Sequence, residues 1–124
     1  MLTSAFCTLA LRQFVATQDC WAQLHISDPG EDGLNGGAID VRRNKIAWGP
    51  VQGLAVSSTN TLTWDNFQGI PSFPQEMKFV TLWNAPTGGI CWATTPIVPI
   101  RVPHGAVLEI PPGITLHLAT LTDD

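Results

Sequence analysis

Three histidines and three cysteines are the residues of this chain whose types could support nucleophilic chemistry. They are His25, His104, His117, Cys7, Cys20 and Cys91. A thiol or hydroxyl becomes a nucleophile when an adjacent histidine accepts its proton. No G-x-S-x-G, H-E-x-x-H or C-x-x-C pattern and no glycine-rich phosphate loop surrounds these residues. A Cys–His site assembled only by the fold stays open, but we predict no catalytic residue and no enzymatic activity.

The carboxylates cluster in one segment, where Asp28, Glu31 and Asp32 surround Pro29 and Gly30. Calcium takes roughly six to eight oxygen ligands, which acidic glycine-containing loops can supply. The EF-hand spacing is absent, however, and Asp-Pro-Gly forms a turn for local reasons, with the Asp28 side chain bonding to its own backbone. We therefore predict a structural turn without a metal or cofactor, and cation binding is the alternative.

Five tryptophans are a high content for a chain of 124 residues. They are Trp21, Trp48, Trp64, Trp83 and Trp92. Aromatic rings on a β-surface can stack on sugars, so a carbohydrate-binding module is one candidate. Tryptophan also fills protein cores and interfaces. We expect core positions first, interface positions second and a sugar platform third.

The charge balance excludes several classes of partner. The chain has 6 Lys+Arg against 10 Asp+Glu, a net charge of −4, and its one basic cluster is Arg42, Arg43 and Lys45. Phosphate groups and anionic lipids both require more clustered cations than this, so we predict no nucleic-acid partner. No run of 18 or more apolar residues exists, and residues 1–13 lack the cationic start of a signal peptide. We therefore predict no membrane insertion.

Charge is missing altogether from two long stretches, residues 46–64 and 79–100. Both pass through expected loops and strand faces that a monomer would normally cover with charged side chains. A surface left so uncharged is typical of one that another subunit covers. We therefore expect an assembly component that forms a homo-oligomer and binds other proteins.

A short helix and a series of strands must position these residues. Residues 2–17 fit one helix capped by Thr3 or Ser4. Its apolar stripe contains Phe6, Leu9, Ala10 and Phe14. After Gln18, 11 glycines and 10 prolines punctuate short runs rich in Val, Ile, Thr, Trp and Phe, which is typical of an all-β domain.

Alternation of apolar and polar residues predicts the individual strands. They cover residues 20–26, 61–64, 77–83, 90–93, 98–103, 108–110 and 114–119. His25 and His117 then fall at polar-face positions and His104 in a turn, where structural or solvated histidines are common. Residues 77–93 form a hairpin. Pro99 and Pro103 mark residues 98–103 as an edge strand or an extended segment, because proline cannot donate to a ladder.

We predict an all-β fold, an antiparallel β-sandwich of the jelly-roll or immunoglobulin-like kind with a short N-terminal helix. A small barrel is the alternative. The length suits a single domain over residues 1–124, with a helical segment at 1–18 and the sandwich at 19–124. The odd number of cysteines predicts free thiols.

Four motifs, in order along the chain, resemble those of small structural proteins in tailed-phage virions. Residues 24–33 (LHISDPGEDG) resemble the LHTADPG-x-x-G segment of that family, and residues 46–49 (IAWG) its I-x-F-G strand. Residues 81–89 (TLWNAPTGG) are similar to its GLWDAATGG hairpin, and residues 105–118 (GAVLEIPPGITLHL) to its closing strands, GDTLxIPAGxLTVTL. Thr81 stands where the family has glycine, and Ala106-Val107 where it has Asp-Thr.

The resemblance implies a non-enzymatic β-sandwich built into a virion, as a minor tail or tail-fibre protein or as a capsid decoration protein. Its partners would be other virion proteins, and its location the virion, assembled in the host cytoplasm. The alternative function is recognition of a host receptor through a surface glycan.

Overall fold

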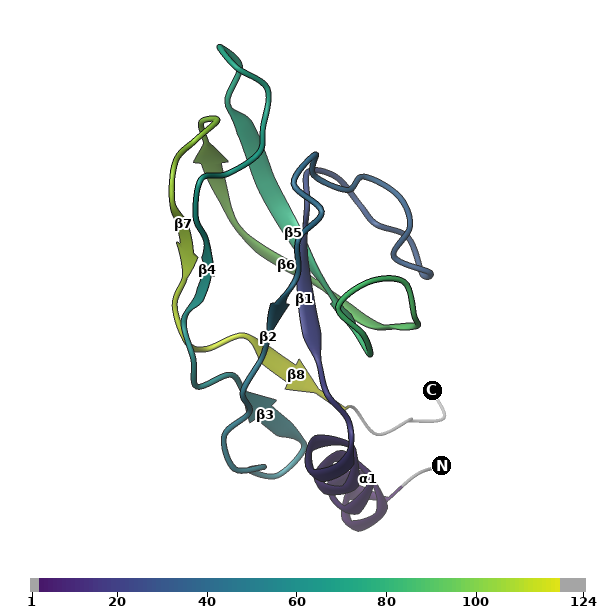
Figure 1. Cartoon of the computed structure of the whole chain (residues 1–124). Coiled ribbons are helices and arrows are strands. Elements are labelled where there is room, and N and C mark those ends of the chain that lie inside the picture. The colour runs from purple at the N-terminus through teal and green to yellow at the C-terminus, as the bar shows by residue number, and fades with distance from the viewer. Residues whose placement is uncertain (1–2, 119–124) are drawn as a thin grey trace.

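One helix and eight strands make up the described part of the chain, residues 3–118, in the computed structural model (Figure 1). The helix is α1 (Ser4–Thr17). The strands are β1 (Trp21–His25), β2 (Asn44–Lys45), β3 (Ala55–Ser57), β4 (Leu62–Trp64), β5 (Gln75–Trp83), β6 (Cys91–Val102), β7 (Leu108–Ile110) and β8 (Thr115–His117). The all-β class with a short N-terminal helix is therefore confirmed.

The strands form three antiparallel sheets. The largest has four strands in the order β2-β1-β5-β6, and the pairs β3-β8 and β4-β7 form the other two. In the centre of the large sheet, Trp21 lies opposite Trp83 and His25 opposite Phe79. Hydrogen bonding does not join the sheets over residues 3–118 into the closed barrel that was the alternative architecture.

The hairpin expected at residues 77–93 is confirmed, but both of its arms are longer. The expected strands 90–93 and 98–103 are one strand, β6, which ends at Val102 and lies at the sheet edge. Its register against β5 shifts twice, between Met77 and Phe79 and between Leu82 and Trp83. The first shift absorbs Pro99, and Pro96 stays in register opposite Phe79, so β6 continues through both prolines instead of ending at them.

Two short strands have no counterpart among those expected from alternation. β2 holds only two residues, and β3 runs along the small sheet with β8. Residues 46–49, expected as a strand from the resemblance, follow β2 and contribute a single bridge between Trp48 and Ser58. Two or three residues are too few to show the alternation of apolar and polar side chains that predicts a strand. These strands are therefore defined only by the segments with which they pair.

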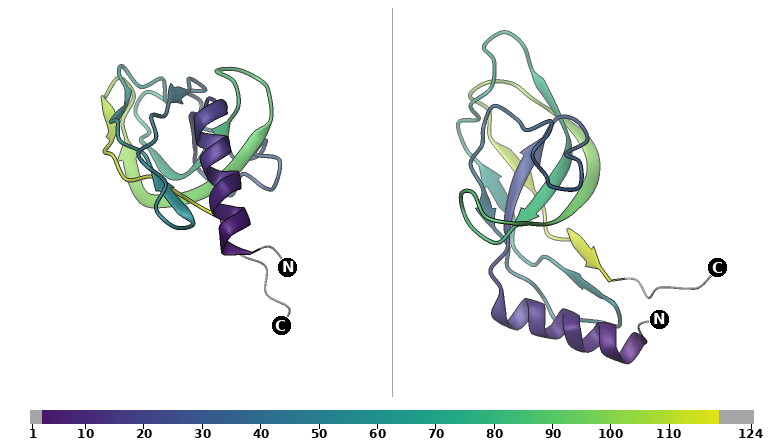
Figure 2. Two further views of the ribbon diagram at one scale, coloured as in Figure 1. Left: turned by 90° about the horizontal axis from the view of Figure 1, so that it is seen from below. Right: turned by 90° about the vertical axis from the view of Figure 1, so that its right-hand side faces the viewer.

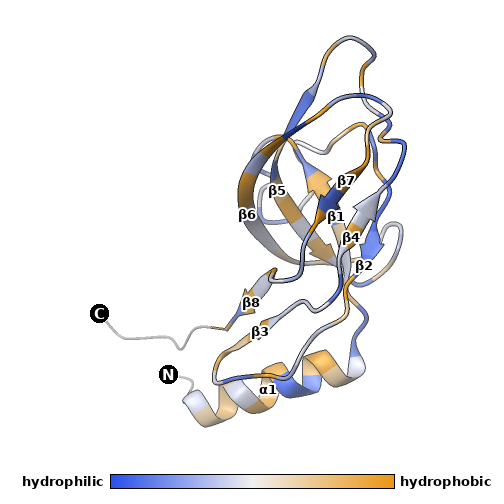
Figure 3. Ribbon diagram, turned by 90° about the vertical axis from the view of Figure 1, so that its left-hand side faces the viewer, coloured by the Kyte–Doolittle hydropathy of each residue, from blue (hydrophilic) through white to orange (hydrophobic). Residues whose placement is uncertain are grey.

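One hydrophobic core is shared by the large sheet and the β4-β7 pair. It is built from Cys20, Ala22, Leu24, Ala38, Ile46, Leu62, Trp64, Phe67, Met77, Val80, Leu82, Val102, Leu108, Ile110 and Ile114. Ten of these residues come from β1, β4, β5, β6 and β7, and the other five come from the segments beside the strands. Figure 3 shows the apolar segments that run along β5 and β6. The core therefore lies where these two sheets meet.

Helix α1 crosses one end of the molecule beneath β3 and β8 (Figure 2). Thr3 caps it by accepting a hydrogen bond from the Phe6 amide at 3.2 Å. The face it buries contains Cys7 and Leu11, whereas Phe6 and Leu9 are 55% and 62% exposed. The expected apolar stripe was thus wrong by part of a turn, because a helix with apolar residues on several sides does not reveal which side is covered.

Candidate functional site

A hydroxyl lies beside one histidine in the fold. His25 Nε2 is 2.8 Å from Thr81 Oγ1, and His25 Nδ1 is 2.8 Å from the backbone oxygen of Asn35. Thr81 reaches His25 because it lies one diagonal step from it across the β1–β5 pairing. A hydroxyl next to a histidine whose second nitrogen is held in place is the geometry that a nucleophile needs.

Burial closes this pair to substrates. His25 is 1% exposed and Thr81 0%. The Thr81 hydroxyl also accepts a hydrogen bond from Trp83 Nε1 at 2.7 Å. The His25–Thr81 pair therefore belongs to a buried polar network, in which His25 has the structural role expected of it, although a loop and not solvent covers its face of the sheet.

The other histidines are exposed. His104 Nδ1 lies 3.2 Å from both the nitrogen and the oxygen of Gly69, so its ring holds a turn. His117 lies on β8, the edge strand of a two-stranded sheet. Neither histidine has a thiol or hydroxyl among its hydrogen-bond partners in the described residues.

The three cysteines carry free thiols in separate places. Cys7 is buried on α1, Cys20 is buried in the core, and Cys91 is half-buried at the start of β6. Burial raises the pKa of Cys20 to about 12, and it also raises the pKa of Cys91. A thiol with a raised pKa holds little thiolate at neutral pH and is a weak nucleophile.

The acidic segment forms local turns. Asp28 Oδ1 accepts a hydrogen bond from the Gly30 amide at 3.0 Å, and Asp32 Oδ1 accepts one from the Leu34 amide at 3.1 Å. The bond from Asp28 is the local cap that the sequence predicts. Among the residues that the structure describes, no group of three or more His, Cys, Asp or Glu side chains, Glu31 included, is arranged to hold a metal ion.

Each cation of the basic cluster has a partner within the chain. Arg42 pairs with the buried carboxylate of Asp40 at 2.7 Å. Arg43 stacks on the Trp83 ring, with its guanidinium carbon 4.1 Å from the ring centroid. Lys45 lies 3.4 Å from an oxygen of Asp19. The cluster thus holds loops and strand ends together and does not form a basic patch.

The tryptophans are mostly covered. Trp64 and Trp83 are fully buried, Trp21 and Trp48 are half-buried, and Trp92 is 40% exposed. The Trp92 ring also contacts Phe14 of α1 edge to face, with centroids 5.3 Å apart. The expectation that core positions come first therefore holds.

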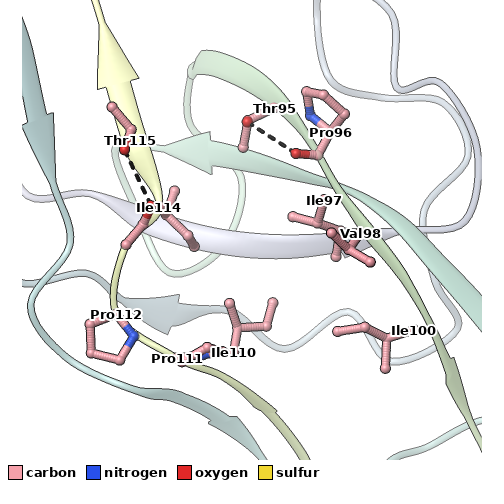
Figure 4. Close-up of a pocket in the computed structure, with 11 residues that line it drawn as sticks. Thr95, Pro96, Ile97, Val98, Ile100, Ile110, Pro111, Pro112, Ile114 and Thr115 are labelled. Carbon is pink, nitrogen blue, oxygen red and sulfur yellow. Dashed lines mark hydrogen bonds between the residues drawn. The ribbon is translucent and has the colours of Figure 1, made fainter.

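An apolar groove of about 380 Å³ runs between β6 and the chain that links β7 to β8. Its lining consists of Thr95, Pro96, Ile97, Val98, Ile100, Ile110, Pro111, Pro112, Gly113, Ile114 and Thr115. We call it the edge groove. Figure 4 shows Ile97, Val98 and Ile100 on one side, and Ile110 and Ile114 on the other.

The side chains that line the edge groove carry no charge, and both of their hydroxyl groups are engaged. Its two hydroxyls bond to nearby backbone, Thr95 Oγ1 donating to the Pro96 oxygen and Thr115 Oγ1 to the Gly113 oxygen. Ile114 is only 8% exposed in the groove, whereas Val98 is 84% exposed. The groove can therefore bind apolar side chains, but it holds no group that could move a proton.

One half of the edge groove was detectable in the sequence and the other was not. The uncharged stretch 79–100 contains the β6 half, whose residues 96 and 98 are exposed. The other half comes from residues 110–115, where the sequence predicted only a turn and strand ends. No local pattern indicates that these two segments meet, because their proximity depends on how the sheets pack.

No family model matches the chain, and no curated protein matches it. Over residues 3–118, no helix is long and apolar enough to cross a membrane.

Proposed function

We propose that this protein is a non-enzymatic structural component of a tailed-phage virion, acting through protein–protein contacts as a minor tail or tail-fibre protein or as a capsid decoration protein. The observation that carries the assembly role is the edge groove, an uncharged apolar surface beside an edge strand. The order of motifs along the chain supports the virion as its location. The protein would be part of the virion, which is assembled in the host cytoplasm.

The motif residues support this role because they shape turns. Gly33, in the first motif, has φ +73°, and a Cβ there would lie 2.7 Å from Cys91 Sγ and 2.9 Å from the Trp83 ring. Asn84, in the hairpin motif, accepts a hydrogen bond from the Ile90 amide through its side chain. Residues that fix loop geometry are what a rigid assembly module needs.

We further propose that the two sheets sharing the core form a β-sandwich. Support comes from the core itself, where Leu62 and Ile110 of the β4-β7 pair join Leu24, Val80 and Val102 of the large sheet. Inward side chains from facing antiparallel sheets make such a core.

Protein partners suit the edge groove better than a glycan. Sugar recognition uses polar side chains that orient hydroxyl groups beside an exposed aromatic ring. Trp92, the most exposed tryptophan, has its ring against Phe14, and the edge groove has both hydroxyls engaged. We therefore propose other virion proteins and further copies of this chain as partners, and no nucleic acid.

One matched pair of substitutions tests the assembly role. Val98→Asp places a charge at the exposed edge of the groove, and Val107→Asp places one at a valine that is 61% exposed and outside the groove lining. Both variants should fold like the wild type, because surface changes usually alter stability by less than about 0.5 kcal/mol. Only Val98→Asp should fail to enter particles, because it would bury an unpaired charge.

The melting temperature, the soluble yield and the abundance in purified particles would be measured for each variant. Incorporation of Val98→Asp at the level of Val107→Asp would exclude the edge groove as an interface. Absence of the wild-type protein from purified particles of the phage that encodes it would exclude the virion role.

A further inference from the structure

His25 lies beneath a loop that covers the face of the large sheet opposite the core. The loop, residues 26–37, is called the covering loop. Two backbone hydrogen bonds close its base, from the Ile26 amide to the Gly36 oxygen at 2.8 Å and from the Ala38 amide to the Leu24 oxygen at 3.1 Å. The ring of His25 adds a third attachment through the Asn35 oxygen.

The partners of His25 determine where its proton lies. The Asn35 oxygen can only accept, so Nδ1 carries the hydrogen. Trp83 Nε1 can only donate, so the Thr81 oxygen accepts from it. The Thr81 hydroxyl hydrogen then donates to His25 Nε2, which must be unprotonated. Every group in this chain of hydrogen bonds is satisfied only while His25 is neutral.

A second proton on His25 would disrupt this chain of hydrogen bonds. Nε2 would become a donor facing the Thr81 hydroxyl, whose own hydrogen would lose its acceptor. The new positive charge would also be buried near Arg43, which is fixed on Trp83 and bonded to the Ala85 and Gly88 oxygens at 2.8 Å. Burial and Arg43 accordingly hold the pKa of His25 below its ordinary value of 6.5, although the bond to Asn35 opposes them.

The other charged and titratable groups around this face do not offset the new charge. The covering loop carries Asp28, Glu31 and Asp32; Asp28 and Asp32 bond to amides of their own turns. Glu31 is exposed. From β6, Cys91 contributes a thiol whose pKa burial raises. Arg43, from the segment before β2, is the formal charge that acts on His25.

We propose that His25 makes the covering loop an acid-released cover, which opens when His25 is protonated while the core stays folded. The loop packs on one face of the sheet and the core cluster lies on the other, where Ala22 and Leu24 of β1 point. Opening uncovers Thr81 and the part of the Trp83 ring beside Gly33, while Arg43 stays stacked on that ring. It does not depend on the protein being a virion component.

The sign of the pH dependence follows from linkage. The unfolded or open loop leaves His25 near its ordinary pKa of 6.5, and the closed loop lowers that pKa. The free energy that favours the closed form over the open form is therefore largest above pH 6.5. It decreases as the pH falls from 6.5 toward the lowered pKa. Within this window, the opening constant should rise up to about tenfold per pH unit.

Amide hydrogen exchange followed by NMR between pH 7.5 and 5 tests the proposal. After correction for intrinsic exchange rates, protection at Ile26 and Ala38 should fall by up to about tenfold per pH unit below 6.5. Protection at Val80 in the core should hold. Constant protection at Ile26 and Ala38, or an equal loss at Val80, would overturn the proposal.

Three variants separate His25 from other titrating groups. His25→Asn keeps a side-chain donor for Asn35 without titrating, so the pH dependence of loop protection should vanish. Thr81→Ser keeps the hydroxyl and should retain the pH dependence. His117→Asn removes an exposed imidazole and should behave as the wild type. If His25→Asn does not fold, the imidazole resonances of His25 in the wild type must titrate in step with loop opening, and a mismatch would refute the mechanism.

Discussion

Asp40 shows how a single residue organises a junction in this fold. Its carboxylate is 1% exposed, and it accepts hydrogen bonds from Arg42 Nε at 2.9 Å, Arg42 Nη2 at 2.7 Å and the Gln68 amide at 3.0 Å. Arg42 Nη2 in turn donates to the Asp65 backbone oxygen. The segment before β2 is therefore tied to the segment after β4 through the buried carboxylate of Asp40 and its partly exposed partner Arg42.

Replacing Asp40 with asparagine should destabilise the protein by about 1–3 kcal/mol. In the wild type, Arg42 and the Gln68 amide donate hydrogen bonds to the second carboxylate oxygen of Asp40. The asparagine side chain would place an NH₂ group there, and it cannot accept them. Asp65→Asn is the matched control, because Asp65 also pairs with Arg42 but its side chain is 81% exposed. That control should cost less than about 0.5 kcal/mol. Urea denaturation at pH 7 measures the free energy of unfolding of both variants. Equal losses of stability would show that the burial of Asp40 does not determine how much its ion pair contributes.

The pH dependence of the Asp40 contribution has the same sign as that of His25 but falls in a more acidic range. Burial raises the pKa of Asp40, but hydrogen bonds from Arg42 and Gln68 outweigh it, so the pKa lies below its ordinary value of 3.8. The stabilisation is complete above that value and is lost as the pH falls through the folded-state pKa. The stability gap between the wild type and Asp40→Asn should therefore narrow in acid.

At the scale of elements, α1 is held by a narrow contact. Besides Cys7 and Leu11, it is fixed by the Thr8 hydroxyl donating to the Gly53 oxygen at 2.9 Å and by Phe14 against Trp92. Neither buried residue belongs to the main core cluster. The helix therefore depends on a small contact of its own with the sheets.

Leu11→Ala and Leu9→Ala form a pair with the same chemistry on the same helix. Leu11 is 3% exposed and Leu9 62%. The first substitution should cost about 2–4 kcal/mol, because it empties a buried site, and the second less than about 0.5 kcal/mol. Thermal melts followed by circular dichroism at a helix wavelength would measure both. A larger loss for Leu9→Ala would mean that the helix docks through its other face.

The elements could be predicted from the sequence where their signal is local. The helix, the β5–β6 hairpin and the edge position of β6 follow from capping, alternation and proline chemistry. β2 and β3 could not be predicted, because strands of two and three residues exist only through their partners. The buried side of α1 depended on which strands lie above it.

At the scale of the whole molecule, the candidate sites required contacts between distant segments. His25 and Thr81 are 56 residues apart, and the two sides of the edge groove come from residues 95–100 and 110–115. The sequence indicated that β6 lacks charge, but not what lies across from it. It placed His25 on a polar face without showing that residues 26–37 fold over that face.

The three thiols report on how the whole fold opens. Cys7 and Cys20 are buried in different parts of the molecule, and Cys91 is half-buried. At pH 8, a disulfide reagent should label Cys91 first, and Cys7 and Cys20 only as fast as the protein opens around them. Mass spectrometry would locate each label. In denaturant without reductant, all three should react, and a count of one would mean that an internal disulfide had formed.

The prolines of β6 protect the edge of the large sheet against the addition of further strands. An unprotected edge strand offers a row of backbone donors on which further strands can add without end. Pro96 and Pro99 have no backbone N–H to donate, and the register shifts against β5 interrupt the regular spacing of the other donors. A foreign strand therefore finds no continuous ladder of donors along β6, which disfavours edge-to-edge aggregation of the folded protein.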